Sequence, residues 1–185
     1  MRSISKLSKL PIIPDYSGII LRMQDTYGAF WSYLPQEQKD LIHQGDYLMN
    51  EIIRHQSYQF KDYSFLVFPY AKAYEGFLKQ LFLDTGLIVR LEYISDHLRL
   101  GKLMSPNLVG RLRERSLYKK ITEAVSKDLA DEIWETWKVG RNQTFHYFPH
   151  NLKSLTFEEA EDLVKKIIGV MEQAYQKLSP RLKKK

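Results

Sequence analysis

Cysteine is absent from all 185 residues of this chain, which excludes a disulfide framework, a thiolate nucleophile and any cysteine-based zinc or iron–sulfur site. The chain also lacks a run of about 18 apolar residues, the length that a membrane-spanning helix needs. Its first 14 residues include three basic side chains but no continuous apolar segment, so no signal peptide is predicted. We therefore expect a soluble protein of the reducing cytoplasm that does not bind membranes.

Several enzyme signatures are missing as well. The sequence contains no phosphate-binding GxxxxGK[ST] loop, no HExxH zinc motif and no GxSxG nucleophile elbow. His43 and His55 are separated by twelve residues, which is not a spacing of metal ligands on a helix. We therefore expect neither a metal nor another cofactor.

Strict alternation of apolar and polar residues is scarce, whereas apolar residues recur at helical spacing almost everywhere. This pattern predicts an all-α protein, a bundle of four to five principal helices joined by short connections. One helix is expected over 36–55. A second is expected to begin near Pro69, which suits a first helical turn, and to end at 84–86. A shorter helix is expected over 89–100, before a loop that includes Gly101.

The C-terminal half continues the helical pattern from about Ile121, with an interruption near 126–128. The last helix is marked most clearly, because Thr156 and Glu159 form a capping box and Ser179-Pro180 ends the apolar stripe.

A hydrophobic content of 44% over 185 residues is enough for one core. We divide the chain into an N-terminal extension, 1–35, that packs or forms an interface, a helical domain, 36–178, and a basic tail, 179–185. The formal charge is +6, and the tail supplies four of these charges, which leaves 6 − 4 = +2 for the rest.

One basic island stands out in the middle of the chain, opposed locally only by Glu114. Clustered cations attract a phosphate backbone more strongly than dispersed ones, so the island is a candidate RNA-binding surface. A solvated helix face explains the same pattern equally well. The basic island consists of Arg111, Arg113, Arg115, Lys119 and Lys120.

The stretch 141–146 combines an arginine, four intervening residues and a histidine. A neutral imidazole such as that of His146 can take the proton of a ribose 2′-hydroxyl near pH 7, and the Arg141 guanidinium can stabilise the charge of the phosphorane that forms. Such a reaction cleaves RNA without a metal and leaves a 2′,3′-cyclic phosphate and a 5′-hydroxyl. DNA lacks the 2′-hydroxyl, so the chemistry selects RNA. Asn142 is a candidate auxiliary for orienting a phosphate, and Tyr147 is a candidate phosphate or base contact.

The spacing of this pair has a geometric consequence. Five residues of a straight α-helix turn by about 500°, which leaves the two side chains about 140° apart and about 7.5 Å apart along the axis. Arg141 and His146 therefore converge only if the helix breaks near Gly140 or Pro149, or if a two-fold axis joins two copies of the chain. The second solution predicts a homodimer with a composite site.

The Arg-Asn-x-x-x-His element, near the end of an all-α bundle and before a long amphipathic helix, resembles the HEPN superfamily of nucleotide-binding and RNase domains. The stretch 70–82, Tyr-Ala-Lys-Ala-Tyr-Glu-Gly-Phe-Leu-Lys-Gln-Leu-Phe, looks like the first core helix of the branch that contains the RNase LS type of toxin. The resemblance covers roughly 36–178. It implies that Arg141 and His146 are the catalytic pair, that Asn142 assists them, that dimerisation builds the cleft and that an antitoxin restrains the activity.

Glu75 lies beside the apolar stripe of its helix, where a carboxylate can hold the Arg141 guanidinium; an exposed surface glutamate is the other interpretation. The resemblance also favours an acidic residue there. In some toxins of the family a tyrosine two residues after the motif histidine is nucleotidylated. Here Tyr147 follows the histidine directly and Phe148 occupies that place, so we do not expect this form of control.

Three functions remain open at this point. The sequence favours an endoribonuclease toxin of a toxin–antitoxin or phage-defence pair. A non-catalytic HEPN-like module that binds RNA, a nucleotide or a protein is the alternative, and a helical scaffold without a nucleic-acid role is the third.

Overall fold

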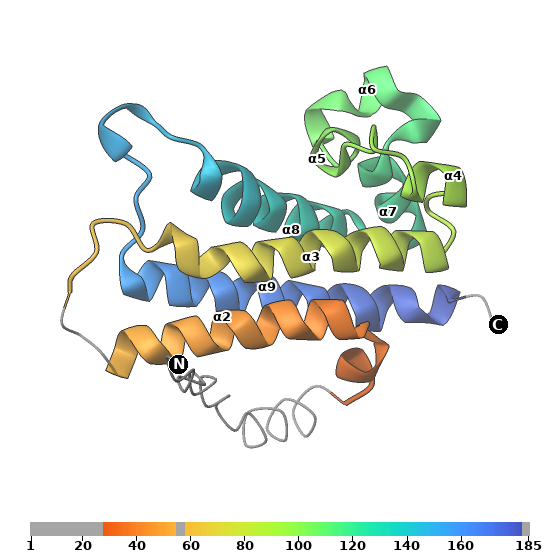
Figure 1. The fold of residues 1–185 in the computed structure, drawn as a ribbon. Coiled ribbons are helices and arrows are strands. Elements are labelled where there is room, and N and C mark those ends of the chain that lie inside the picture. Colours follow the sequence, from red (N-terminus) through yellow and green to blue (C-terminus); the bar gives the residue numbers. More distant parts are fainter. Residues whose placement is uncertain (1–27, 55–57, 183–185) are drawn as a thin grey trace, which may run out of the picture.

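The computed structural model describes residues 28–54 and 58–182, and no strand occurs among them (Figure 1). The long helices α2 (Gln36–Arg54), α3 (Ser64–Asp84) and α9 (Phe157–Leu178) lie side by side. A fourth, α8 (Lys127–Trp137), packs against α9 and against α3, where the Tyr74 hydroxyl donates to the Ile133 carbonyl at 3.0 Å. The prediction of an all-α fold is confirmed for this part of the chain.

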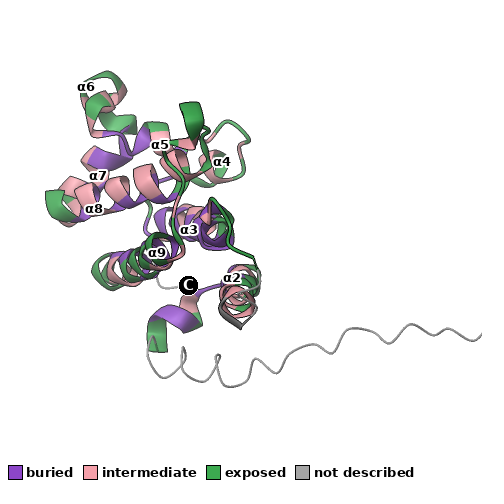
Figure 2. Ribbon diagram, turned by 90° about the vertical axis from the view of Figure 1, so that its left-hand side faces the viewer, coloured by how far each residue is buried: buried purple, intermediate pink, exposed green. Residues whose placement is uncertain are grey.

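The helix α3 forms the centre of the bundle because it carries apolar side chains on more than one face. It contacts α2 on one side and α9 on another, and Figure 2 shows it mostly buried. The buried side chains of this helix include Tyr70, Ala73, Tyr74, Phe77, Leu78, Leu81 and Phe82.

The predicted start of this helix at Pro69 is wrong, since α3 begins at Ser64 and contains Pro69 inside its second turn. Asp62 explains the earlier start, because its carboxylate accepts the Ser64 backbone N–H at 2.9 Å and so caps an otherwise unpaired donor. The rest of the helix tolerates the proline because tertiary packing buries the segment around it.

Asp62 also joins the start of α3 to the segment that precedes α9. Its carboxylate accepts hydrogen bonds from Asn151 Nδ2 at 3.1 Å and from the Leu155 N–H at 3.2 Å. His150 and Asn151 adopt positive φ angles of 57° and 54°, a conformation that histidine and asparagine adopt more readily than most residues. Burial by itself raises the pKa of Asp62, but the hydrogen bonds from Ser64, Asn151 and Leu155 outweigh it and lower the pKa below the usual value.

We expect Asp62→Ala to lower the free energy of unfolding by about 1–3 kcal/mol, because it leaves a helix N–H and a loop without their acceptor. The folded-state pKa lies below the unfolded one, so the carboxylate stabilises the fold above about pH 4 and this stabilisation is lost as the pH falls. Urea unfolding at pH 7 and at pH 3 measures both effects. Asp96→Ala, at an exposed aspartate, is the matched control. An equal loss of unfolding free energy in the two variants would contradict the role given to Asp62. So would an effect of Asp62→Ala that is the same at pH 7 and at pH 3.

Residues 85–116 form a lobe of short helices at the right of Figure 1. The predicted helix over 89–100 is wrong. Two short helices, α4 (Arg90–Tyr93) and α5 (Leu100–Leu103), replace it, because Ser95 accepts the His97 N–H and stabilises a turn between them. The predicted loop position of Gly101 is also wrong, since it lies in α5, where an added Cβ would come within 2.6 Å of Trp137 Nε1.

Capping residues determine where the helices after the lobe begin. After α6 (Val109–Leu112), Ser116 caps α7 (Leu117–Ala124) by accepting the Lys119 N–H at 3.2 Å. Ser126 caps α8 in the same way by accepting the Leu129 N–H at 3.2 Å. The interruption predicted near 126–128 is therefore present. The capping box of Thr156 and Glu159 and the end of α9 at Leu178 are confirmed.

The described part of the N-terminal extension belongs to the same core as the domain. Residues 28–33 are helical, and Phe30, Trp31 and Leu34 are buried in the cluster that α3 and α9 build. The Phe30 ring meets Phe77 edge to face at 5.7 Å. Residues 28–35 therefore share one core with the domain that follows the predicted boundary at residue 35. The expectations for 1–27 and for the tail end 183–185 lie outside the described residues. Within the described part of the chain, no helix is long and apolar enough to cross a membrane.

Candidate functional site

The segment that carries Arg141 is a π-helix, Lys138–Gln143, which continues α8 directly. Its wider turn ends where the Thr144 N–H and hydroxyl both donate to the Val139 carbonyl, five residues earlier. Gly140 lets this turn lie close to α9, because an added Cβ would come within 3.0 Å of Ile167 Cδ1. Insertions of this kind are frequent at functional sites, and this one fixes the position of the next residue, Arg141.

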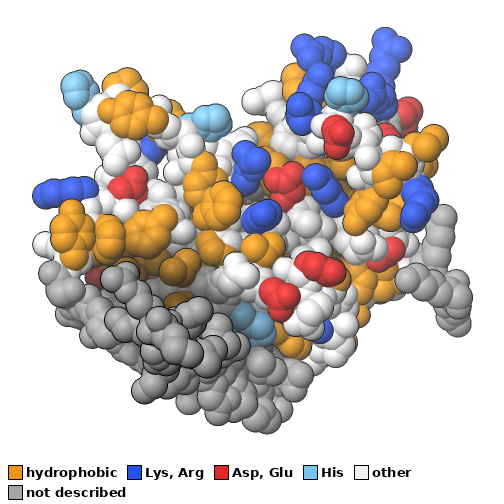
Figure 3. All heavy atoms as spheres, viewed as in Figure 1, with side chains coloured by type: hydrophobic (Ala, Val, Ile, Leu, Met, Phe, Trp, Pro, Cys, Tyr) orange, Lys and Arg blue, Asp and Glu red, His pale blue; other side chains and the backbone are white. Residues whose placement is uncertain are grey.

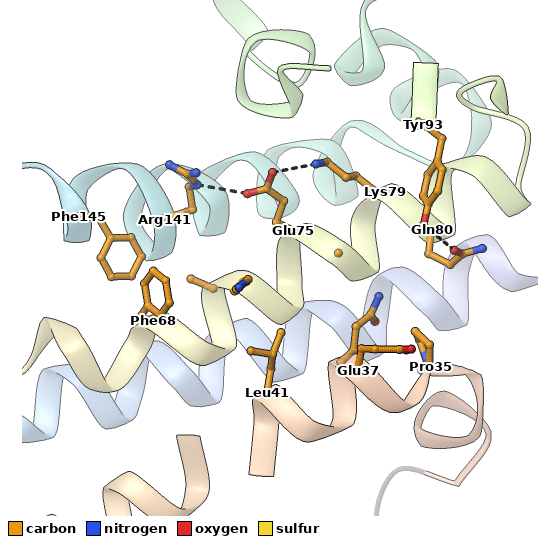
Figure 4. Close-up of a pocket in the computed structure, with 14 residues that line it drawn as sticks. Pro35, Glu37, Leu41, Phe68, Glu75, Lys79, Gln80, Tyr93, Arg141 and Phe145 are labelled. Atoms are coloured by element: carbon orange, nitrogen blue, oxygen red, sulfur yellow. Dashed lines mark hydrogen bonds and ion pairs between the residues drawn. The ribbon is translucent and has the colours of Figure 1, made fainter. Parts of the chain in front are cut away.

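The guanidinium of Arg141 is held from two sides. Its Nε lies 3.4 Å from Glu75 Oε2 (Figure 4). Its Cζ lies 5.8 Å from the centre of the Trp137 ring. The second carboxylate oxygen of Glu75 pairs with Lys79 Nζ at 3.1 Å. The described residues make no other ion pair or hydrogen bond with Arg141, so Nη1 and Nη2 are left for an anion. The contact between Glu75 and Arg141 that the sequence suggested is therefore present.

Arg141 and Glu75 line a groove of about 800 Å³ between α2 and α3, which we call the α2–α3 groove. In Figure 4 it runs along α3 from Phe68 and Phe145 at one end to Gln80 and Tyr93 at the other. The cations that line it are Lys72, Lys79 and Arg141, and the carboxylates are Glu37 and Glu75. The groove therefore combines charged, amide and aromatic groups, the composition of a ligand site more than of a core defect.

One wall of the groove contains an unsatisfied amide. Gln38 is only 8% exposed, and its Oε1 has no hydrogen-bond partner among the described residues. The side chain fits against α3 because Gly76 has no Cβ, which would lie 3.2 Å from Gln38 Nε2. A buried amide oxygen without a partner is unfavourable, and this one is covered by the protein rather than open to the groove.

The second member of the motif lies elsewhere. His146 is exposed in the bend that follows the helix, and it does not line the α2–α3 groove. Asn142 is half-buried in the π-helix, and Tyr147 is 79% exposed. The expected helix break at Gly140 is wrong: the π-turn widens the helix there, and the helix continues to Phe145 before the chain bends at His146. This geometry does not bring His146 into the groove that Arg141 lines.

The basic island lies apart from the motif histidine. Figure 1 shows the α4–α6 lobe at the right, whereas the segment after α8 extends to the left. Lys119 pairs with Glu114 and lies 3.7 Å from Glu123, and Lys120 donates to the Leu87 carbonyl at 2.7 Å. The members that stay exposed are Arg111, Arg113 and Arg115. Only these three arginines keep the accessibility that an RNA backbone requires.

Sequence reasoning missed part of the groove. Phe68, Lys72 and Lys79 follow one another on α3 at intervals of four and seven residues, so they share a face with Glu75, and this spacing was the available signal. Gln38 gave no signal, because its burial depends on how α2 meets Gly76. Among the described residues, no group of three or more histidine, aspartate or glutamate side chains could hold a metal ion.

Comparisons of this chain with protein-family models, with curated proteins and with solved structures found no match.

Proposed function

We propose that this protein is a metal-independent endoribonuclease of the HEPN type, in which Arg141 binds the scissile phosphate and His146 acts as the base. The observation that carries the proposal is the placement of Arg141. A π-turn sets it on the wall of an open groove, Glu75 holds its Nε, and both Nη atoms remain available. A guanidinium held in this way stabilises developing charge without having to reorganise during the reaction.

The reaction follows from the two side chains. His146 takes the proton of a ribose 2′-hydroxyl, and the resulting oxygen attacks the adjacent phosphorus. Arg141 neutralises the charge of the phosphorane. The bond to the 5′-oxygen then breaks and that oxygen takes a proton, from water or from an imidazolium, which leaves a 2′,3′-cyclic phosphate and a 5′-hydroxyl. Asn142 lies beside Arg141 on the chain and assists in orienting the phosphate.

A homodimer completes the site. His146 lies on an exposed segment outside the groove, so a second copy can bring its own His146 to the Arg141 of the first. The same segment exposes Tyr147 and Leu152, the latter at 75%, and these side chains give a second copy apolar surface to cover. Each dimer then contains two composite sites.

The biological role that fits this activity is that of a toxin whose RNA cleavage an antitoxin restrains, in a toxin–antitoxin or phage-defence pair. The exposed arginines of the lobe, Arg111, Arg113 and Arg115, supply general attraction for the RNA backbone.

Incubation of the purified protein with single-stranded RNA in EDTA tests the proposal. We expect cleavage with 2′,3′-cyclic phosphate ends, and no cleavage of the same sequence as DNA. Arg141→Ala should abolish it. Absence of cleavage, or cleavage that the Arg141 variant leaves unchanged, would reject the enzymatic proposal.

Glu75 provides a more specific prediction, because it touches Arg141 and not the reacting atoms. Glu75→Gln should lower kcat about three- to tenfold, since a neutral amide holds the guanidinium less firmly. It should not raise KM for RNA, since the lost carboxylate repelled phosphate. Thermal unfolding should change little, because the pair is partly exposed.

The control is Glu37→Gln, which removes an exposed carboxylate from the same groove without touching the pair. It should leave kcat unchanged. Equal kcat values for the two variants would show that Glu75 contributes only to the charge of the groove.

One observation favours a second candidate, a HEPN-like module that binds RNA, a nucleotide or a protein without cleaving it. In a single chain the groove contains Arg141 but not His146, an arrangement that suffices for binding. RNA affinity without turnover, unaffected by His146→Ala, would support this candidate.

A further inference from the structure

Two exposed phenylalanines stand at one end of the α2–α3 groove. Phe68 is 54% and Phe145 is 37% exposed, and their ring centroids lie 5.6 Å apart at an interplanar angle of 81° (Figure 4). Neither ring is required to fill the core, and each leaves apolar surface in water at a cost. Such surface beside a polar groove is typical of a binding site.

The basic side chains of the groove continue from this aromatic end. Lys72 follows Phe68 by one turn of α3, about 6 Å along the axis, and Lys79 follows Lys72 by two turns. Arg141 reaches the groove between them through its contact with Glu75. Figure 3 shows basic side chains on this face across the middle of the bundle as well as over the lobe. A row of cations along one helix matches an extended chain of phosphates.

The acidic groups of the groove only partly offset this row. Glu75 is already paired with both Lys79 and Arg141, and the exposed Glu37 lies on the opposite wall. Lys72 is exposed and has no ion pair or hydrogen bond among the described residues. The aromatic end is therefore flanked by an unpaired cation on α3 and by the available Nη atoms of Arg141.

Aromatic faces next to cations are the combination that binds single-stranded nucleic acid, because every base has a face that can stack. The groove is too small for a duplex, whose paired bases also offer no free face to a side chain.

We propose that the α2–α3 groove binds single-stranded RNA with one base stacked on the face of Phe68 and its edge against the nearly perpendicular Phe145 ring, next to the phosphate that Arg141 holds. This inference rests on the proposed function, and it names the two rings that position the strand at the cleavage site. Phe68 and Phe145 are binding residues here, because they touch a base beside the reacting phosphate and not the reacting atoms.

The test measures binding without cleavage. Full-length protein with His146→Ala is titrated into fluorescein-labelled hexanucleotides of adenine, cytosine or uracil, and fluorescence anisotropy gives Kd. Adding Phe68→Leu or Phe145→Leu should weaken binding roughly ten- to hundredfold, because leucine keeps the apolar volume but offers no aromatic face. Phe68→Trp should retain the affinity of the parent.

Phe65→Leu is the matched control, since Phe65 is an exposed phenylalanine on the same helix that does not line the groove. It should leave Kd unchanged. Hexanucleotides that lack the base at one position provide a second measurement. At the position that occupies the stacking site, the missing base should raise Kd for the parent protein. For the Phe68→Leu variant, the same missing base should cause no further rise in Kd. Unfolding midpoints of all variants should agree, because the replaced rings are exposed.

Affinities of Phe68→Leu and Phe145→Leu equal to that of the parent, or an equal loss for Phe65→Leu, would overturn the stacking site. If wild-type protein cleaves RNA while these variants bind normally, the stacking site alone fails. If binding depends on both rings while wild-type protein cleaves no RNA, the enzymatic proposal alone fails. No binding of any hexanucleotide would reject both.

Discussion

Replacing His146 by alanine is expected to lower the rate of RNA cleavage by about 10²–10⁴-fold, the usual contribution of a positioned general base. The imidazole is exposed at the end of the helix, so its removal takes away the proton acceptor without disturbing the core. RNA affinity should remain, because the groove that holds Arg141 does not include His146. The measurement is a single-turnover cleavage rate at saturating protein, together with Kd for the same RNA.

His150→Asn is the matched control for this variant. His150 is exposed on the same segment, and asparagine accepts its positive φ angle of 57°. The control should cleave RNA at the wild-type rate. If it loses activity to the same extent as His146→Ala, the segment as a whole matters and the role of base does not belong to His146.

The capping residues made most of the helix boundaries predictable. Thr156 with Glu159 starts α9, and Ser126 divides α7 from α8, because local side chains satisfy the first N–H groups of each helix. The start of α3 was not predictable in the same way. The signal at Pro69 was overridden by Asp62, whose hydrogen bonds include partners 89 and 93 residues away in sequence.

Some contacts of the candidate site were likewise predictable from the sequence, and others were not. The contact between Glu75 and Arg141 was accessible to sequence reasoning, because the carboxylate flanks the apolar stripe of α3. The π-turn was not, since it depends on how Gly140 meets Ile167 of α9. The spacing of Phe68 places it on the same face of α3 as Lys72 and Glu75, but only the position of α2 decides that its ring faces a groove.

Because His146 lies outside the groove, mixing two inactive variants is expected to restore RNA cleavage. In a composite site, Arg141 of one copy works with His146 of the other. A heterodimer of an Arg141→Ala chain and a His146→Ala chain then has one site that lacks both groups and one site that is intact. The intact site combines the Arg141 of the second chain with the His146 of the first.

Random exchange of subunits makes half of the dimers mixed, and half of the sites in those dimers are intact. The mixture should therefore recover about a quarter of the wild-type activity from two components that are each inactive. Each variant is also mixed with wild-type protein, which verifies that subunits exchange under the conditions used.

The central claim is that Arg141 and His146 act together across a two-fold axis, and this mixing assay tests it most directly. RNA cleavage at about a quarter of the wild-type rate, with each variant inactive alone, is the result that the composite site predicts. No recovery of cleavage, under conditions in which subunit exchange with wild-type protein is demonstrated, would contradict it.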